Sequence, residues 1–385
     1  MISFKLDDDV LAIQDTVRKF ADTELRAKMR EAEEAGGISE SLVKRYQDLG
    51  LSTLELPEEA GGLALGMITK VVIEEELAFG DAAMAAAIDR GGPLAYALLE
   101  LGTEDQRKQH LSESLSGTAG FWEPGQSETF TDLETRIREE GDEVRITGRK
   151  CLVPNAGQVD WYVIFGTIDR ARGWEGVRAV LVPKDAAGLT IGKPDEKAGL
   201  WALRTADVTL EDVCVPKANV LPGASSSEQA RQTSGIREGI ERFMARVQIV
   251  NAARSLGVAR AAYEYALQYA ATRQAFGQAI ANHQAVAFML ADMSILVDAA
   301  RVLVWRGAAL IDKGLNARKE CAQALVQADV LAGKITIDAV QVLGGAGFIR
   351  DYPCEKWMRD ARTLSLLCGS DHAHNQLVAE HIMAA

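Results

Sequence analysis

The sequence contains little cysteine, and its cysteines are poorly placed for cross-linking. There are five of them, an odd number, far apart in the chain, and no two stand in C-x-x-C spacing. Disulfide frameworks and thiolate zinc sites both need paired or grouped cysteines, so the sequence argues against either. We interpret all five as reduced thiols in the cytosol: Cys151, Cys214, Cys321, Cys354 and Cys368.

The chain is also poor in positive charge and in long apolar runs. It has 42 Lys and Arg against 55 Asp and Glu, a formal net charge of −13, which would repel a nucleic-acid backbone. No stretch reaches the ~18 apolar residues of a membrane span. The start, MISFKLDDDV, has three aspartates where a signal peptide needs an apolar core. We expect a soluble, cytoplasmic protein with no nucleic-acid partner and no membrane span.

Common motifs of nucleotide and metal enzymes are missing. No G-x-G-x-x-G follows an expected strand, no G-x-x-x-x-G-K-[ST] occurs, and the five histidines form no metalloprotease motif. His372 and His374 are two residues apart, so on a helix they would point to different sides. We interpret them as part of a solvated helix face and predict no metal site.

The sequence does have three blocks with different hydrophobic patterns. Apolar residues recur at helical spacing in the first third, the middle third consists of short β-like runs between turns, and helical patterns return after SSSEQARQTSG. Generic nucleotide folds alternate strands and helices throughout, so a Rossmann fold is disfavoured. We predict an α+β protein with an N-terminal helical domain (1–117), a middle β domain (118–225) and a C-terminal helical bundle (235–385).

Three segments combine unusual residues. In TRQAFGQ (272–278), Arg273 beside a Phe-Gly break could bind a phosphate, although a turn that joins two helices is the simpler explanation. In QVLGGAGF (341–348), three glycines in four positions would let a cofactor or a backbone approach closely, and a glycine-rich corner is the alternative. The third segment, 207–221, indicates a strand followed by an exit loop.

In this order and at these separations, the three segments resemble those of the acyl-CoA dehydrogenase family. GTEDQR (102–107) resembles a helix start of that family, and EPG (123–125) resembles one of its loops. The resemblance runs along the whole chain. It implies the acyl-CoA dehydrogenase-like fold, with a four-helix C-terminal bundle, assembled as a tetramer of two dimers. It also implies FAD at each dimer interface and desaturation of an acyl-CoA beside the flavin, with a carboxylate that removes the acyl α-proton.

That carboxylate is absent at both places where family members carry it. Counted from Arg359-Asp360-Ala361, the Glu of the family's Y-E-G-T segment corresponds to Cys368. The alternative Glu-Arg pair, about 26 residues before Arg273, corresponds to Val247-Gln248, and Glu241 should face elsewhere on its helix. Apolar neighbours raise the pKa of a thiol. We therefore predict no catalytic residue in this chain and interpret Cys368 as a small buried hydrophobe.

The residues that the resemblance assigns to FAD divide into two sets. Those that hold the flavin within one subunit are replaced. Trp122 is found where the family has a Thr, and Pro154 has neither an N–H nor a hydroxyl to offer. Glu128 is found near the position of a family Ser that approaches the diphosphate, where a carboxylate would repel phosphate. Those that reach across the dimer interface to the partner's FAD match the family: Arg273, Phe276, Gln341, Gly344, Gly345 and Gly347. A subunit that completes a partner's site needs only this second set.

We therefore favour a base-lacking subunit of a heterotetrameric (α2β2) acyl-CoA dehydrogenase, inactive alone, whose homologous partner supplies the base, holds most of the FAD and passes electrons to an acceptor. The resemblance links such subunits to bulky CoA thioesters in lipid or steroid catabolism. One alternative is a self-contained flavoenzyme with a displaced base or non-oxidative acyl-CoA chemistry. Arg90 would then bind an anionic substrate group, although a salt bridge explains it more simply. The other alternative is an FAD-free scaffold or binding protein.

Overall fold

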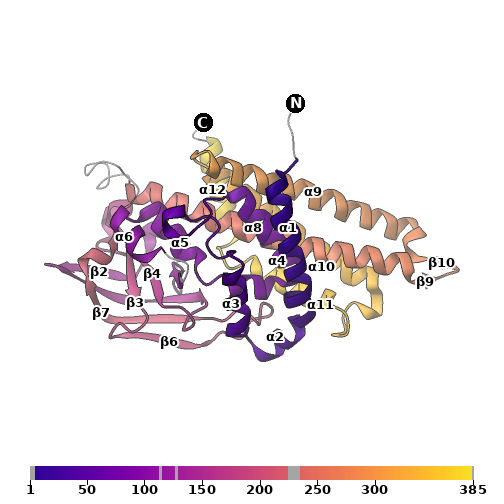
Figure 1. Cartoon of the computed structure of the whole chain (residues 1–385), viewed down its shortest axis with the longest axis horizontal. Helices are drawn as coiled ribbons and strands as arrows, with labels where there is room; N and C mark the ends of the chain where they lie inside the picture. Colours follow the sequence, from indigo (N-terminus) through magenta and orange to yellow (C-terminus); the bar gives the residue numbers. More distant parts are fainter. Residues whose placement is uncertain (1–4, 112–114, 126–128, 224–234, 384–385) are drawn as a thin grey trace.

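The computed structural model describes residues 5–111, 115–125, 129–223 and 235–383. Helices come first, a β-sheet follows, and long helices end the chain (Figure 1). This order confirms the predicted fold class.

Six α-helices precede the sheet within residues 5–111. They are α1 (Asp8–Phe20), α2 (Met29–Ala35), α3 (Glu40–Asp48), α4 (Met67–Ile88), α5 (Gly92–Leu101) and α6 (Glu104–His110). The predicted helix start at 102–107 is present, because the Thr103 hydroxyl accepts a hydrogen bond from the Gln106 N–H while the Gln106 side chain accepts one from the Thr103 N–H. Helix α4 is buried almost throughout and forms the inner layer of this part.

The middle part of the chain forms a single sheet of eight strands in the described residues. These are β1 (Gly117–Gly120), β2 (Arg136–Glu140), β3 (Glu143–Pro154), β4 (Trp161–Thr167), β5 (Val177–Pro183), β6 (Leu189–Pro194), β7 (Thr205–Pro216) and β8 (Val220–Leu221). Their order is β6-β7-β3-β2-β4-β5-β8, and β1 adds to β4 in parallel. Residues 207–216 belong to β7, as predicted, but the expected exit loop does not leave the sheet at once: 217–219 form a short 3-10 turn and 220–221 form β8, which pairs with β5.

Both faces of the central strands are buried. Along β4, Val163 and Phe165 belong to the core that the sheet shares with the helices, whereas Tyr162 and Ile164 belong to a second core on the other face of the sheet. Side chains alternate between the two faces of a strand, which explains this division. The sheet is thereby fixed against the helices on one side.

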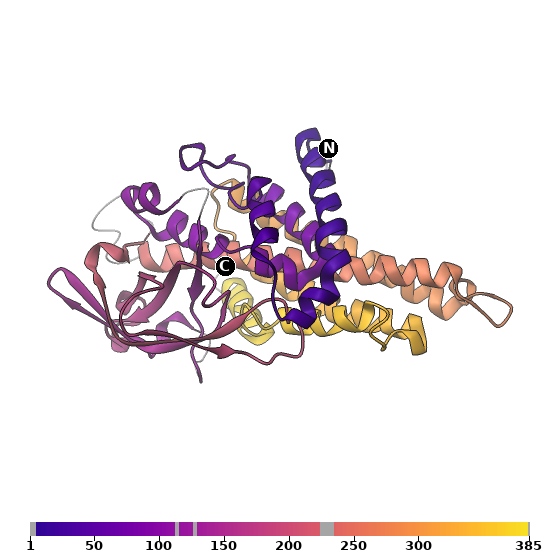
Figure 2. The same ribbon diagram turned by 60° about the horizontal axis from the view of Figure 1, so that its bottom comes forward.

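The C-terminal part is built around α8 (Ile236–Thr272), a helix of 37 residues and about 55 Å. It is followed by a short hairpin, β9 (Gln274–Ala275) and β10 (Gln278–Ala279), and by α9 (Gln284–Asp312), α10 (Arg318–Leu343), α11 (Cys354–Leu364) and α12 (Asp371–Met383). Figures 1 and 2 both show the hairpin at the end of the bundle farthest from the sheet. No helix in the described ranges is long and apolar enough to cross a membrane.

Buried ion pairs join α8 to α4. Arg254 contacts Glu74 at 2.7 Å and Asp89 at 2.8 Å, and Arg260 contacts Glu75 and Glu76. Burial by itself would raise the pKa of Asp89, but nearby Lys70 and Arg254 hold it below its ordinary value. These pairs connect the first and last thirds of the chain through the core.

Candidate functional site

The hairpin carries two of the predicted cofactor residues at its exposed tip. Phe276 and Gly277 are the two turn residues, with φ of 52° and 83°, which is the arrangement of a two-residue type I′ turn. Phe276 is 96% exposed. Among the described residues, no carboxylate pairs with the exposed Arg273, which follows the last residue of α8. The hairpin therefore offers an aromatic ring and an unpaired guanidinium to the outside of the chain.

The glycine-rich corner lies at the end of α10. Gln341 is exposed in its last turn, and a Cβ added to Gly344 or Gly345 would meet no atom within 4 Å. A Cβ on Gly347 would instead lie 2.3 Å from the Val340 carbonyl oxygen. Gly347 thus serves close packing within the chain, whereas the other two glycines leave open surface. Among the described residues, the corner and the hairpin share no hydrogen bond, ion pair or ring contact.

Cys368 lies in the loop between α11 and α12 and is fully buried. Burial raises the pKa of its thiol far above the ordinary value, the neighbouring Asp329 adds to the increase, and Arg254 only partly opposes it. A protonated thiol cannot accept the α-proton of a substrate. The structure therefore places an inert side chain where the resemblance expects a base.

Trp122 closes the space beside this loop. Its indole Nε1–H donates a hydrogen bond to the Leu367 carbonyl at 3.1 Å, and a Cβ on Gly369 would lie 3.1 Å from the indole. Phe121 packs edge-on against the indole, with ring centroids 4.7 Å apart. Trp122 thus spans from the end of the sheet to the loop that carries Cys368.

The strand beside Trp122 is irregular. The pairing of β3 with β7 shifts between Lys150 and Val153, and Leu152 adopts a φ of 53°, which is unfavourable for a leucine. The Cys151 N–H donates to the Trp122 carbonyl. Backbone strain of this kind is concentrated at functional sites. Pro154 ends the strand, and Glu128 lies outside the described residues.

A buried carboxyl group lies behind Cys368. The Ser255 hydroxyl donates to Asp329 Oδ1 at 2.6 Å, across the contact between α8 and α10. Burial raises the pKa of Asp329 to about 7, the hydrogen bond from Ser255 opposes this shift, and Asp371 adds to it. Asp329 does not line the cavity described next.

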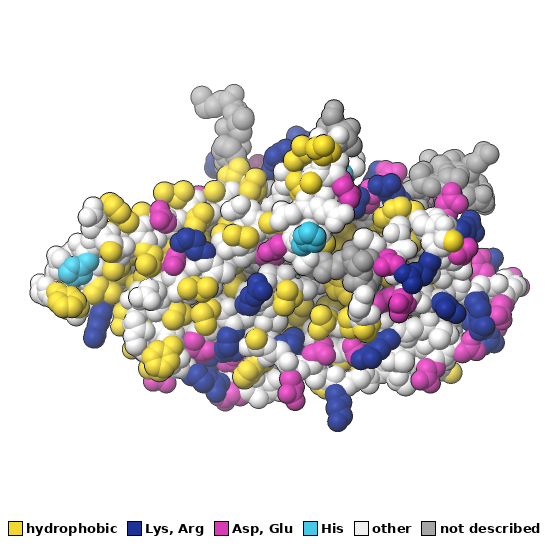
Figure 3. Space-filling model, turned by 180° about the vertical axis from the view of Figure 1, so that it is seen from behind, with side chains coloured by type: hydrophobic (Ala, Val, Ile, Leu, Met, Phe, Trp, Pro, Cys, Tyr) yellow, Lys and Arg dark blue, Asp and Glu magenta, His cyan; other side chains and the backbone are white. Residues whose placement is uncertain are grey.

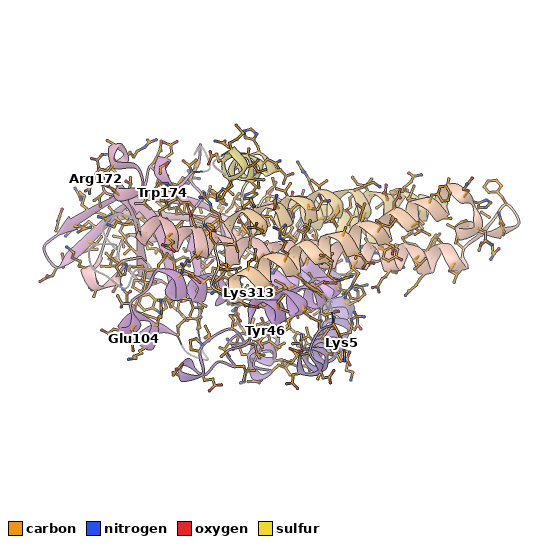
Figure 4. The ribbon with its side chains drawn as sticks, turned by 90° about the horizontal axis from the view of Figure 1, so that it is seen from above. Lys5, Tyr46, Glu104, Arg172, Trp174 and Lys313 are labelled. Carbon is orange, nitrogen blue, oxygen red and sulfur yellow. The ribbon has the colours of Figure 1, made fainter. Side chains whose placement is uncertain are left out.

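A cavity of about 270 Å³ lies between the sheet and the helices α8 and α12. Trp122, Phe130 and Trp174 line it from the side of the sheet, and Gln248 and His374 line it from the helices. Figure 4 shows Trp174 on the same side of the molecule as α12, opposite Tyr46 of the N-terminal part. Cys368 is not among the lining residues, so the cavity and the thiol are separate.

The structure corrects one sequence-based interpretation, confirms the salt bridge expected for Arg90 and adds to what was expected of Glu241. His374 is not on a solvated face: it is 4% exposed and its Nδ1 lies 3.3 Å from Gln248 Nε2, whereas His372 is exposed as predicted. Arg90 is buried and paired with Glu40. Glu241 also lines the cavity, where it pairs with Arg237 and Arg318.

The role of His374 depends on a contact between helices that are far apart in sequence. The two-residue spacing of the histidines indicates only that His372 and His374 point to different sides of their helix. The apolar Leu377 and Val378, three and four residues further along the helix, are the available signal that this face is covered. The described residues contain no cluster of three metal-ligating side chains.

Comparison with known proteins gives a consistent result along the chain. Models of the N-terminal, middle and C-terminal domains of acyl-CoA dehydrogenase match residues 7–118, 118–213 and 235–383. The mitochondrial short-chain specific acyl-CoA dehydrogenase of Rattus norvegicus is 32% identical over 388 residues, covering 99% of this chain and 92% of that protein.

Solved structures agree. Butyryl-CoA dehydrogenase from Megasphaera elsdenii superposes with a TM-score of 0.92 and 26% identity over 99% of this chain and all of that one. A chain from a structure on the electron transferring flavoprotein of Acidaminococcus fermentans gives a TM-score of 0.92 and 28% identity over the full length of both chains.

Proposed function

Because the chain belongs to the acyl-CoA dehydrogenase family, we propose that it is a subunit of a flavin-dependent enzyme that desaturates an acyl-CoA thioester. It is the base-lacking subunit of an α2β2 complex and completes the FAD site of a homologous catalytic partner. The position of Trp122 is the observation that carries this proposal. Its indole fills the space between the sheet and the loop of Cys368, where the resemblance expects flavin and substrate to meet.

The chain's acidic groups also support a non-catalytic role. Glu241 and Glu380 line the cavity, but the first pairs with two arginines and the second accepts a hydrogen bond from Gln376. Asp329, whose pKa near 7 would suit a proton acceptor, lies outside the cavity. General bases must reach the proton that they remove, and the described part of the cavity offers no unengaged carboxylate for this step.

The fit of the chain to FAD differs between the two sets of residues. Arg273, exposed and unpaired among the described residues, suits a diphosphate, and the open surface at Gly344 and Gly345 suits close approach of a cofactor held by another chain. Trp122 and Pro154 do not suit an isoalloxazine ring within this chain, because the first occupies space and the second has no donor. The residues that would reach the partner's FAD thus suit the cofactor, whereas the residues that would hold a flavin within this chain do not.

The bundle carries an apolar surface on which a homologous subunit would fit. Phe288, Ile295 and Val302 on α9 are exposed at intervals of seven residues, as are Val330 and Ile337 on α10. Residues at this spacing lie on one helix face. Figure 3 shows hydrophobic side chains spread over the bundle half of one side of the molecule. We infer that this surface is covered in the complex.

Bound FAD would supply the hydride acceptor of the reaction. This chain's contribution is to hold the cofactor: Arg273 neutralises the diphosphate of the partner's FAD, Phe276 covers it, and Gln341 donates to a polar edge of it. The partner supplies the base, and electrons leave through the partner to an acceptor, for which an electron transferring flavoprotein is the candidate suggested by the structural similarity.

The test is cofactor content with and without the partner, which the genome context of the chain should identify as a homologue that carries Y-E-G-T and W-x-T segments. We expect the chain purified alone to be colourless and the co-purified complex to contain FAD and to oxidise acyl-CoA. One FAD per chain in a homotetramer would instead support a self-contained flavoenzyme. Absence of FAD from both preparations would support an FAD-free scaffold.

A further inference from the structure

A buried ion pair lies directly beside Trp122 in the chain. The neighbouring residue, Glu123, accepts a hydrogen bond from Lys150 Nζ at 2.5 Å. Its carboxylate also accepts the N–H groups of Glu134 at 2.5 Å and Thr135 at 3.0 Å. A carboxylate that binds an ammonium group and two backbone donors fixes the backbone around it. The position of Trp122 is thereby tied to Lys150 on β3.

The ammonium group of Lys150 is enclosed by the sheet. Its side chain is fully buried, and a Cβ added to Gly120 of β1 would lie 3.1 Å from its Cγ. Val208 lies opposite it on β7. Within the described ranges, Glu123 is the one acidic side chain that pairs with it. A buried charge that loses its single partner is strongly unfavourable, so the two groups depend on each other.

The other charged groups near this pair are engaged elsewhere. They pair with one another at more exposed positions: Arg149 with Asp207, and Glu134 with Arg170. The Cys151 thiol is the second titratable group that acts on Lys150, and burial raises the pKa of this thiol, so it stays uncharged at neutral pH. The charge of Lys150 therefore acts chiefly on Glu123.

Glu123, in contrast, has water within reach. It lines a cavity of about 420 Å³ whose walls include the exposed residues Arg136 and Thr147. If Lys150 loses its charge, the carboxylate gains by exchanging the neutral amine for water in this cavity, because an anion without a charged partner is costly to bury. Such a turn outward would move the backbone of the preceding residue, which is Trp122.

The strand that Trp122 contacts has a strained backbone. The Trp122 carbonyl accepts the Cys151 N–H at 3.0 Å, and the next residue, Leu152, has a φ of 53°. The pairing of β3 with β7 shifts in the same stretch. Strained backbone persists only where the surrounding contacts hold it. Loss of one of these contacts, at Lys150, therefore favours a rearrangement of this stretch.

The charge of Lys150 changes close to neutral pH. Burial lowers the pKa of this lysine from 10.5 to about 8, and the attraction of Glu123 only partly opposes the change. The folded chain therefore releases this proton to solvent water at a pH at which ordinary lysines remain charged.

We propose that Lys150 is a positioning residue for Trp122. Its ammonium group holds Glu123 inside the sheet and the indole against the loop of Cys368, and loss of its charge lets Glu123 turn to the cavity and releases the indole. This inference rests on the proposed function only for its consequence, which is that the space expected for the flavin stays closed while Lys150 is charged. The experiment needs neither FAD nor a partner, so the two proposals can fail separately.

The test follows Trp122 itself in the isolated full-length chain. The six tryptophans are replaced by 5-fluorotryptophan, and Trp122→Phe identifies the fluorine NMR resonance of Trp122. Between about pH 6.5 and 9.5 we expect this resonance to move with a midpoint near pH 8. Its solvent isotope shift between H2O and D2O, which reports contact with water, should increase over the same range, whereas that of the fully buried Trp357 should not change.

Variants assign the effect to Lys150. Lys150→Met, with a neutral side chain of similar length, should keep the resonance throughout at the position that the wild type reaches at high pH. Lys184→Met removes an exposed lysine that pairs with Asp160, and it should titrate as the wild type does. Asp329→Asn should also titrate. It excludes the buried carboxyl whose pKa is raised to about 7, and it keeps the test decisive when Lys150→Met does not fold.

Three results would overturn the proposal. The first is a Trp122 resonance that does not titrate while circular dichroism shows a folded chain. The second is a titration that persists in folded Lys150→Met or disappears in Asp329→Asn. The third is a titration without an increase in the solvent isotope shift, because a change of charge alone can move the resonance while the indole stays in place.

Discussion

The buried carboxyl group of Asp329 should make the stability of the protein depend on pH in a direction opposite to that of most carboxylates. Its pKa is raised to about 7 by burial, against 3.8 for an ordinary Asp. Between these values the folded chain holds a proton that the unfolded chain has released. The unfolded state therefore binds fewer protons, and the free energy of unfolding falls as the pH rises.

Replacing Asp329 with Asn removes this dependence and keeps the hydrogen bond, because the Ser255 hydroxyl can still donate to an amide oxygen. Below pH 7 the wild-type chain loses up to ~1.4 kcal/mol per pH unit relative to the variant, and the loss levels off above pH 7, where the folded chain also releases the proton. From pH 5.5 to 8.5 the loss amounts to ~2 kcal/mol, most of it between pH 5.5 and 7. For 385 residues the unfolding entropy is ~0.8 kcal/mol/K, so the difference in melting temperature should shift by about 2–3 °C.

The assay is thermal unfolding of the wild type, Asp329→Asn and Asp298→Asn, followed by circular dichroism from pH 5.5 to 8.5. Asp298 is exposed on α9 and pairs with Arg301, so its variant controls for the loss of one negative charge. We expect the melting temperature of Asp329→Asn to rise relative to wild type as the pH increases. A difference that stays constant over this range, or one that the Asp298 control reproduces, would refute the argument.

Three further predictions concern the FAD site and the missing base. In the complex with the partner, Arg273→Ala should lower FAD occupancy, measured from flavin absorbance, because a charge-assisted contact is worth ~1.5–3 kcal/mol; unchanged occupancy would remove Arg273 from the site. Cys368→Ala should leave the desaturation rate of the complex within about twofold at matched FAD content, and a hundredfold loss would show that the thiol is catalytic. Gly347→Ala should lower the melting temperature of the isolated chain, since its methyl would overlap the Val340 carbonyl and such overpacking costs ~1–3 kcal/mol. Gly345→Ala should leave that temperature unchanged and weaken FAD in the complex, whereas equal destabilisation by both variants would contradict the division between packing and cofactor approach.

The sequence predicted the arrangement of the fold well, because periodicity reports directly on helices and strands. The turn at Phe276-Gly277 and the capping of α6 by Thr103 follow from local residue chemistry, and the structure has both. The burial of Cys368 was also predicted, but for an incomplete reason. Its neighbour Leu366 is exposed, and the surroundings of the thiol include Arg254 and Asp329 from other helices.

The polar interior could not be predicted in the same way. The contact of His374 with Gln248 joins residues 126 positions apart, and the hydrogen bond of Trp122 to Leu367 joins residues 245 positions apart. Neither the spacing of the histidines nor the replacement of a Thr by Trp122 contains this information. Such contacts depend on how whole helices pack against the sheet, which a local pattern does not determine.

The ion pairs between α4 and α8 mean that the N-terminal and C-terminal helical parts cannot be separated into independent folding units, although the sheet lies between them in sequence. Arg254 and Arg260 are buried only because α4 supplies their carboxylates, and removal of one partner of a buried pair leaves an uncompensated charge. A fragment that contains only residues 235–385 would expose two arginines and the apolar face around them. A chimera made by joining two homologous sequences at the start or end of the sheet would likewise need α4 and α8 from the same homologue. These two helices should therefore be exchanged together.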